Sequence, residues 1–274
     1  MAIVVGTDFS SASADALARA TDLARSSGAT LHVVHASRRL PAALARGLGI
    51  GTDGRAVART LEGFAKEIAA AGARARTHHA RGSATKALCA TSRAVGASLV
   101  VVGSRGRTVP DSTIGSTAER VASASRTPVL LVRRKVSGAY RDVVIAADVD
   151  SDVRAALAAA RMVAPDARLS VLHVYAAPFE PTLQLEGAGA ATIQSYRRQA
   201  RREAEESMTP LLEKAGVDPS SLELHRGDAR RVLSRVDARS LLVINRSRSL
   251  VRHAFFGSVT RWVLAYGTMD VLLV

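Results

Sequence analysis

VVVGSRG, at residues 100–106, carries an apolar strand straight into a glycine turn, and GST at residues 115–117 follows after eight intervening residues. The first segment predicts a parallel strand covered on both faces, because its apolar run is continuous rather than alternating. The second predicts the start of a helix. Backbone N–H groups of a glycine turn and of a helix N-terminus together form a nest that suits phosphate. The two segments therefore predict an anion-binding turn at the end of a buried strand.

The same arrangement recurs, in altered form, in the second half of the chain. VINRSR at residues 243–248 is followed, again after eight residues, by GS at residues 257–258. Further landmarks match in the same order: VVGTD 4–8 with VIAAD 144–148, LHVVH 31–35 with LSVLH 169–173, RG 81–82 with RG 226–227, SLVVV 98–102 with SLLVI 240–244, and VLLV 129–132 with VLLV 271–274. These matches predict a duplication into two tandem domains, residues 1–137 and 138–274.

Strands and helices alternate in each half. In the first half, apolar runs predict strands near residues 2–7, 30–36, 74–79, 97–103 and 128–132. Helix-spaced apolar stripes comprise Val57, Leu61, Phe64 and Ile68 in the first half, and Ile193, Tyr196, Ala200, Ala204, Met208 and Leu211 in the second. Residues 176–190, with two prolines and two glycines, predict a long loop. Right-handed crossovers then give an α/β fold of two doubly wound domains, each with a five-stranded parallel sheet in the order 3-2-1-4-5.

Ligands of such sheets bind beyond the carboxyl ends of the strands, at the point where the strand order reverses. The turn at Asp8 follows the first strand and the turn at Gly103 follows the fourth. These strands are neighbours in the order 3-2-1-4-5, so both turns are expected at one crevice. A structural alternative stays open for Asp8, Ser116 and Thr117, because each would also serve as a helix cap.

Composition restricts the function further. The single cysteine among 274 residues, Cys89, excludes an internal disulfide framework and a multi-cysteine zinc site. The start of the chain does not resemble a signal peptide and no apolar run reaches membrane length, so we expect a cytoplasmic protein without a membrane partner. The net charge of +14 favours a polyanion partner. However, the charge is spread over both halves and aromatic content is only 4%, so a dedicated nucleic-acid role is not expected.

Histidines supply the other candidate functional groups. His78 and His79 are adjacent on a predicted strand, so they point to opposite faces and cannot readily share a metal ion. We therefore expect no metal site. His35 and His173 end matching strands, which favours packing or a hydrogen bond over catalysis. No nucleophile, carboxylate pair or general base accompanies the predicted anion site, so no catalytic residue is assigned.

Three segments together resemble the universal stress protein family: GSRG with its following GS at residues 103–116, TDFS at residues 7–10, and PVLLV at residues 128–132. The resemblance covers essentially the whole chain. It implies an α/β fold of the adenine nucleotide alpha-hydrolase-like type. It also implies an adenine nucleotide ligand, namely ATP or else ADP, AMP or cAMP, with Mg²⁺ possible beside ATP. Finally, it implies antiparallel pairing of the last strands, either within the chain as a pseudo-dimer or between chains as a homodimer.

Carried over by position, the family's binding residues are Thr7, Asp8, Ala36, Gly103, Arg105, Gly106, Gly115, Ser116 and Thr117. In this transfer the Asp8 carboxylate accepts from the adenine edge or a neighbouring nucleoside group, and the backbone of Ala36 meets adenine. The turn at residues 103–106 lines the ribose and phosphates. The helix start at residues 115–117 donates hydrogen bonds to phosphate, as a helix N-terminus favours negative charge.

Two departures from the family pattern qualify this transfer. The eight-residue spacing before Gly115 is one residue shorter than is usual in the family, which would shift or narrow the phosphate cradle. In the second copy Asn245 and Arg248 replace both leading glycines. We therefore expect the second copy to bind poorly, to bind a different anion, or to act mainly as a structural partner.

The resemblance thus implies a stress-response protein that binds an adenine nucleotide in its first domain. It would act as a sensor or regulator through nucleotide-dependent conformation or assembly, read by an unidentified regulatory protein, with slow ATP hydrolysis at most. Two alternatives stay open. One is a scaffold that binds no nucleotide and works through dimerisation and protein partners. The other is a polyanion binder, with steep salt dependence and no preference for adenine.

Overall fold

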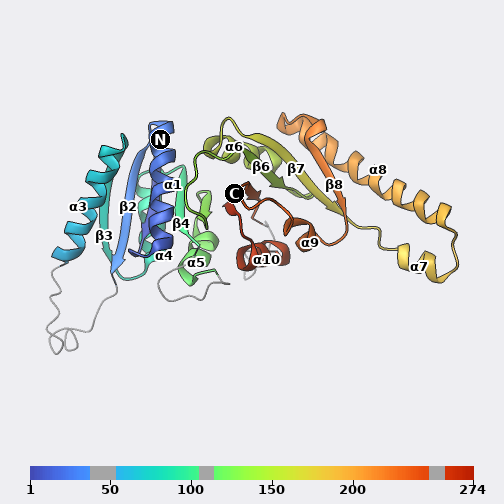
Figure 1. The fold of residues 1–274 in the computed structure, drawn as a ribbon, viewed down its shortest axis with the longest axis horizontal. Helices are drawn as coiled ribbons and strands as arrows, with labels where there is room; N and C mark the ends of the chain where they lie inside the picture. The colour runs from blue at the N-terminus through green and yellow to red at the C-terminus, as the bar shows by residue number, and fades with distance from the viewer. Residues whose placement is uncertain (38–53, 105–113, 247–256) are drawn as a thin grey trace, which may run out of the picture. The chain divides into compact units, whose positions relative to one another are not determined.

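The computed structural model describes residues 1–37, 54–104, 114–246 and 257–274. The chain divides into two compact units, Met1–Gly138 with Leu273, and Ala139–Leu272 with Val274. Strands and helices alternate along each of them (Figure 1).

A parallel sheet forms the centre of the first unit. Its strands are β1 (Ala2–Thr7), β2 (Thr30–Ser37), β3 (Arg74–Arg81), β4 (Leu99–Gly103) and β5 (Val129–Val132), in the order β3-β2-β1-β4-β5. All four neighbouring pairs are parallel. This confirms the predicted order. The apolar residues of β4 and β5 are all buried, whereas β3 at the edge is made of exposed and half-buried residues, as a sheet edge requires.

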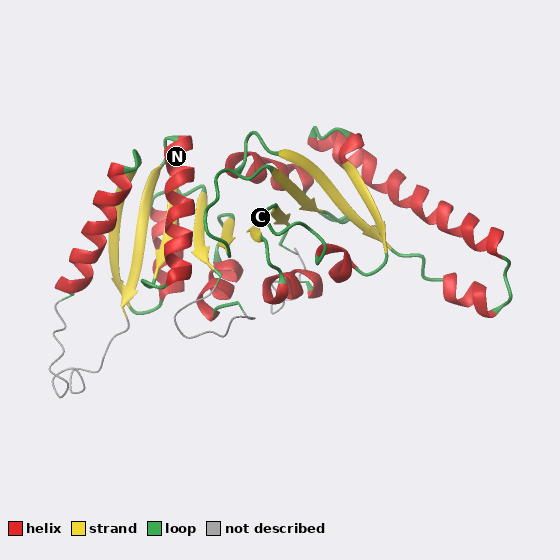
Figure 2. Cartoon of the chain, in the orientation of Figure 1, coloured by secondary structure: helices red, strands yellow, loops and turns green. Residues whose placement is uncertain are grey.

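Helices cover both faces of this sheet (Figure 2). They are α1 (Ser11–Ser27), α3 (Arg55–Ala70), α4 (Ala84–Ala94) and α5 (Ser116–Ala124). Ser10 caps α1 by accepting a hydrogen bond from the Ser13 amide, and Gly28 ends it in the left-handed conformation with φ 67°. On α3 the predicted stripe is turned inward, with Leu61 and Ile68 buried. The α1 cap fixes where the first helix starts beside β1 and β4.

The second unit repeats this plan. Its strands are β6 (Asp142–Ala146), β7 (Arg168–Tyr175), β8 (Leu222–Arg226), β9 (Leu241–Ile244) and β10 (Asp270–Leu273), in the order β10-β9-β6-β7-β8. Its helices are α6 (Val153–Val163), α7 (Glu180–Leu185), α8 (Ala190–Ala215), α9 (Ala229–Leu233) and α10 (Ser258–Tyr266), with a 3-10 turn η1 (Pro219–Ser221). β6 therefore corresponds to β1 and β9 to β4, and the strand order reverses between them.

Two details of the second unit differ from the sequence prediction. Residues 176–190 do not form one long loop, because they contain α7. Pro181 lies in the first turn of α7, where a proline leaves no intrahelical hydrogen bond unmade. The Glu180 carboxylate accepts from Arg197 Nε at 3.0 Å and also from Arg226, which ties α7 to α8 and β8.

The buried stripe of α8 ends one residue later than predicted. Ala200, Ala204, Met208 and Leu212 are buried at intervals of four, whereas Leu211 is half-buried. Strict four-residue spacing carries the stripe to Leu212, because successive residues at this interval stay on one helix face.

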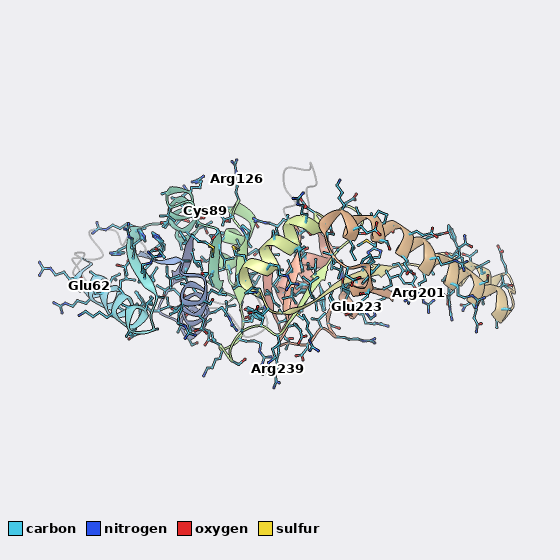
Figure 3. The ribbon with its side chains drawn as sticks, turned by 90° about the horizontal axis from the view of Figure 1, so that it is seen from above. Glu62, Cys89, Arg126, Arg201, Glu223 and Arg239 are labelled. Atoms are coloured by element: carbon cyan, nitrogen blue, oxygen red, sulfur yellow. The ribbon has the colours of Figure 1, made fainter. Side chains whose placement is uncertain are left out.

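Charged side chains lie on the surfaces of both units. Arg126, Arg201 and Arg239 are exposed and come from three different parts of the chain, and Glu62 and Glu223 are exposed as well (Figure 3). Cys89 lies half-buried on α4. Within the described ranges, none of the helices combines the length with the apolar character that crossing a membrane would require.

Candidate functional site

The predicted binding residues of the first unit gather at one edge of its sheet. β1 pairs with β4 through Val5 and Val101, and with β2 through Thr7 and His35. Because the strands are parallel, their carboxyl ends meet at the same edge, which brings Thr7, Ala36 and Gly103 there. The Gly115 amide donates to the Ser104 carbonyl at 2.8 Å, and this bond sets the start of α5 beside the end of β4.

The turn between β1 and α1 is closed by its own polar side chains. Asp8 Oδ1 accepts from the Ser10 amide at 3.1 Å and from Ser10 Oγ at 2.5 Å. Thr7 Oγ1 accepts from the Phe9 amide at 3.1 Å, and Phe9 has a positive φ of 62°, which is uncommon for a residue other than glycine. Asp8 therefore braces the cap residue Ser10, and Thr7 shapes the turn.

Gly103 is required by the packing of α1. A Cβ at this position would lie 2.5 Å from the Ala12 carbonyl oxygen and 2.8 Å from its carbonyl carbon. These are backbone atoms of α1, which cannot swing away as a side chain can. The absence of a side chain thus allows α1 to begin close against the end of β4. The φ of Gly103 is not positive, so glycine is required here by lack of space for a side chain and not by backbone conformation.

The start of α5 offers backbone N–H groups beside the end of β4. Gly115 is the N-cap in an extended conformation and no side chain caps the helix within the described residues. Ser116 and Thr117 are exposed in its first turn. The first amides of a helix lack intrahelical partners and carry the positive end of the helix dipole. Arg105 and Gly106, which the sequence also assigns to this site, lie outside the described residues.

His35 closes the side of the site toward β2. Its Nδ1 lies 2.8 Å from the Thr7 carbonyl oxygen, so this nitrogen carries the proton. The ring stacks on Phe9 with a centroid distance of 4.3 Å. In the second unit His173 Nδ1 lies 3.0 Å from the Ala147 carbonyl in the corresponding place. The expected hydrogen-bonding role of the two histidines is confirmed.

His78 and His79 point to opposite faces of β3, as expected. His78 Nε2 lies 2.9 Å from His32 Nδ1, whereas His79 Nε2 lies 2.7 Å from Ser37 Oγ. Burial lowers the pKa of His32, and the neighbouring charges of His78 and Arg76 lower it further. Burial likewise lowers the pKa of His78, with a smaller effect from Arg76. The part of the chain that the structure describes holds no group of three potential metal ligands.

The second unit has an open pocket at its own reversal point. A cavity of about 870 Å³ lies at the carboxyl ends of β6, β7 and β9 and at the starts of α6 and α10. Its lining includes Asp148, Asp150, Asp152, His173, Asn245, Arg246, Gly257 and Thr260, with apolar walls from Leu172, Leu233 and Ile244. This volume lies within the range of small-molecule sites. The replacement of both leading glycines by Asn245 and Arg248 led to the expectation of poor binding or of a different anion, and it did not predict this pocket. Arg248 lies outside the described residues.

The loop between β6 and α6 is longer than the loop between β1 and α1, and this leaves space for the Asn245 side chain. Pairing of Val101 with Val5, and of Val243 with Ile145, puts Asn245 in the position of Gly103. In the first unit the helix cap, Ser10, lies two residues after Asp8, but in the second unit the cap, Asp152, lies four residues after Asp148. α6 therefore begins farther along the chain. Asn245 Nδ2 donates to the Asp152 carbonyl at 3.1 Å, while its Oδ1 is buried with no donor among the described residues.

Two repeated units with sheets of the order 3-2-1-4-5, and with their polar groups at the reversal points, define a tandem doubly wound α/β protein. The chain belongs to the universal stress protein family, whose model matches residues 1–133 and 139–274. The resemblance seen in the sequence is thus confirmed over both halves.

Two solved structures match nearly the whole chain, and a third matches about half of it. A protein of unknown function from Pseudomonas aeruginosa PAO1 is 19% identical, with 100% of this chain and 92% of that chain covered and a TM-score of 0.68. A universal stress protein from Archaeoglobus fulgidus DSM 4304 is 18% identical, with 99% and 97% covered and a TM-score of 0.68. A universal stress protein in complex with cAMP is 29% identical, with 48% of this chain and 96% of that chain covered and a TM-score of 0.39. No curated protein matches the chain.

Proposed function

We propose that this protein binds an adenine nucleotide in its first unit and acts as a stress-response regulator whose conformation or assembly depends on that nucleotide. The ligand is ATP or a related adenine nucleotide, with the phosphates at the start of α5 and the nucleoside along the ends of β1 and β2. Membership of the universal stress protein family supports the ligand class.

The observation that carries the proposal is the start of α5 beside the end of β4, where none of the described side chains caps the helix. The hydrogen bond from Gly115 to Ser104 brings this helix start to the edge where β1 and β4 end. Backbone amides there point at an anion without any need for a basic side chain. Asp8 supplies a carboxylate at the same edge, suited to a nucleoside amine or hydroxyl.

A charge substitution at the helix start tests the proposal. Ser116→Glu places a carboxylate where the phosphates would lie, and close like charges cost about 1–4 kcal/mol in a surface site, so ATP affinity should fall roughly 10-fold or more. The same change interacts favourably with the helix dipole, by about 0.3–1 kcal/mol, so the fold should not suffer. Ser258→Glu, at the corresponding start of α10, is the matched control and should leave ATP affinity intact.

The measurement is calorimetric titration of ATP into nucleotide-stripped protein, together with mass spectrometry of small molecules released on heating. Binding of one ATP per chain, with an affinity roughly 10-fold or more lower in Ser116→Glu, supports the proposal. If the parent and Ser116→Glu bind ATP with equal affinity, the phosphates do not bind at the start of α5. An absence of heat at millimolar ATP, with no nucleotide released, would favour a scaffold that acts through dimerisation and protein partners.

A further inference from the structure

We propose that one face of the first unit, formed by β3, α4 and α5, binds the phosphate backbone of a nucleic-acid duplex. The inference goes beyond the proposed nucleotide-binding function and does not depend on it. It rests on an uneven distribution of carboxylates, first between the two halves of the chain and then between the two faces of the first sheet.

The net charge of the chain is concentrated in its first half. Lysine and arginine are shared almost equally, with 20 in residues 1–137 and 18 in residues 138–274. Aspartate and glutamate are not, because they number 8 and 16 in the same two segments. The first half therefore carries a net charge of +12 and the second half +2. The even spread of the basic residues, which argued against a nucleic-acid role, conceals this difference.

The strand register shows which side chains share a face of the first sheet. A Cβ on Gly6 would lie 3.0 Å from Leu88 of α4, so α4 covers the face on which that Cβ would stand. Gly6 is in register with Val34, and Val34 with His78. Side chains alternate along a strand, so Arg76 lies on the same face as His78. α5 packs against α4 and covers this face as well.

This face carries exposed cations and almost no carboxylates. We call it the cationic face and define it by Arg76, Lys86, Arg93, Arg120 and Arg126, which are all exposed. Arg126 follows α5 and lies on the same side of the sheet as Cys89 of α4 (Figure 3). Within β3, α4 and α5 the one acidic residue is Glu119. Inside the described ranges, none of these five cations forms an ion pair with a carboxylate.

The opposite face has as many cations but balances them. A Cβ on Gly54, at the start of α3, would lie 2.9 Å from His79, which follows His78 and so points to the other side of β3. α1 lies on this side too, because a Cβ on Gly103 would meet it and the register sets Gly103 opposite to Gly6. These two helices hold the cations Arg19, Arg25, Arg55, Arg59 and Lys66 and the carboxylates Asp15, Asp22, Glu62 and Glu67. A lack of carboxylates therefore distinguishes the cationic face.

The residues outside the described ranges leave this imbalance in place. In the first half they are residues 38–53 and 105–113, which contain five arginines and two aspartates. Whatever their positions, they add more positive than negative charge to the first half, and they bring at most two carboxylates against the five cations of the face.

The chemistry of the cationic face favours a duplex over other polyanions. Insertion into a membrane surface and the core of a protein interface both use exposed apolar side chains. Among the described residues of the first unit, Met1 at the start of the chain is the one large apolar residue that is exposed. Single strands use aromatic stacking, and β3, α4 and α5 contain no Phe, Tyr or Trp. The backbone of a duplex needs only surface cations, because their binding releases condensed counterions.

The test measures binding of a DNA duplex of about 20 base pairs to the full chain, by fluorescence anisotropy over a series of salt concentrations. Three to five phosphate contacts give a slope of log K against log salt of about −3 to −4.5. Lys86→Gln combined with Arg93→Gln removes two cations of the face. The slope should become less steep by about 1.8, and the affinity at about 50 mM salt should fall roughly 10- to 200-fold.

Arg59→Gln combined with Lys66→Gln is the matched control. These residues are exposed on α3 at the same spacing along a helix as Lys86 and Arg93, and the net charge falls by the same amount. Because they lie on the opposite face, the slope and the affinity should stay close to those of the parent. Thermal unfolding followed by circular dichroism checks that both double variants fold as the parent does.

Three outcomes would overturn the proposal. The first is a parent protein that does not bind the duplex at about 50 mM salt, where phosphate contacts are strong. The second is an equal loss of affinity in the two double variants, which would make net charge and not this face responsible. The third is binding to phosphatidylserine vesicles at least as tight as binding to the duplex, which would assign the face to a membrane surface. The nucleotide site is tested separately, by Ser116→Glu.

Discussion

Replacing Gly103 by alanine tests whether this motif glycine is required by packing. The new Cβ would lie 2.5 Å from the Ala12 carbonyl oxygen, against 3.4 Å where ordinary contact begins. Overpacking of a filled site costs about 1–3 kcal/mol. The substitution also lowers the conformational entropy of the unfolded chain, which stabilises the folded state by about 0.4–1 kcal/mol, because alanine can adopt the φ of this residue. The midpoints of these two ranges predict that the free energy of unfolding of the first unit falls by about 1.3 kcal/mol, with an upper bound of about 2.6 kcal/mol, or roughly 4–8 °C in Tm for a unit of this size.

Gly63→Ala is the matched control for this prediction. Gly63 lies inside α3, and a Cβ there would have nothing within 4 Å, so the same substitution should stabilise the helix by about 0.5–1 kcal/mol. Circular dichroism on heating measures both changes, and exchange of α1 and β4 amides assigns the loss to the first unit. The only tryptophan, Trp262, lies in the second unit and its fluorescence should be little affected. A Gly103→Ala protein as stable as its parent, but unable to bind ATP, would refute the packing argument and make Gly103 a ligand residue alone.

Two further changes test the histidine pair and a buried tyrosine. Because the pKa values of His32 and His78 are lowered in the folded protein, the unfolded chain binds more protons below about pH 6.5, so stability should be full above that pH and fall as the pH drops toward the folded values. On acidification the urea unfolding midpoint should therefore decrease less in His78→Gln than in the parent. His225→Gln changes an exposed histidine and should behave like the parent. If the midpoint depends on pH in the same way in all three proteins, the pair of His32 and His78 is not the cause of the pH dependence. Tyr140 Oη donates to the buried carboxylate of Asp270 at 2.6 Å. Tyr140→Phe should therefore lower the free energy of unfolding, measured in urea, by about 1.5–3 kcal/mol. Tyr266 is 64% exposed, so Tyr266→Phe should change this free energy little, and equal effects of the two substitutions would contradict the role of the hydrogen bond.

The strand order, and the gathering of Thr7, Ala36 and Gly103 at one edge of the first sheet, were predictable because they depend on short-range signals. Continuous apolar runs mark β4 and β5, and the positions of Asp8 and Gly103 at the ends of two neighbouring strands place both turns at one edge of the sheet. α7 was missed because the two prolines and two glycines of residues 176–190 suggest a loop by composition, although Pro181 occupies a helix position that tolerates it. The contact of Gly103 with Ala12 is a distance across the fold, which no local pattern reveals.

The pocket of the second unit was missed for a different reason. Asn245 stands where the first unit has Gly103, and this replacement taken alone suggests that the binding site is lost. It gives no information on where α6 begins. The signal was available: Asp152 is a good N-cap residue, and counting from Asp148 to Asp152 shows a connection two residues longer than that from Asp8 to Ser10. A helix that starts later leaves space for a side chain at the end of the neighbouring strand.

Gly103 and Asn245 can thus be understood as two solutions to one packing problem. In the first unit α1 starts close to β4, and only glycine fits between them. In the second unit α6 starts farther on, and the Asn245 amide fills the space by donating to the carbonyl of the helix cap. The side chain at this strand end is therefore coupled to the length of the loop that faces it. Loss of the glycine does not by itself indicate loss of a site, because the same longer loop that accommodates Asn245 also lines the pocket of the second unit with Asp148, Asp150 and Asp152.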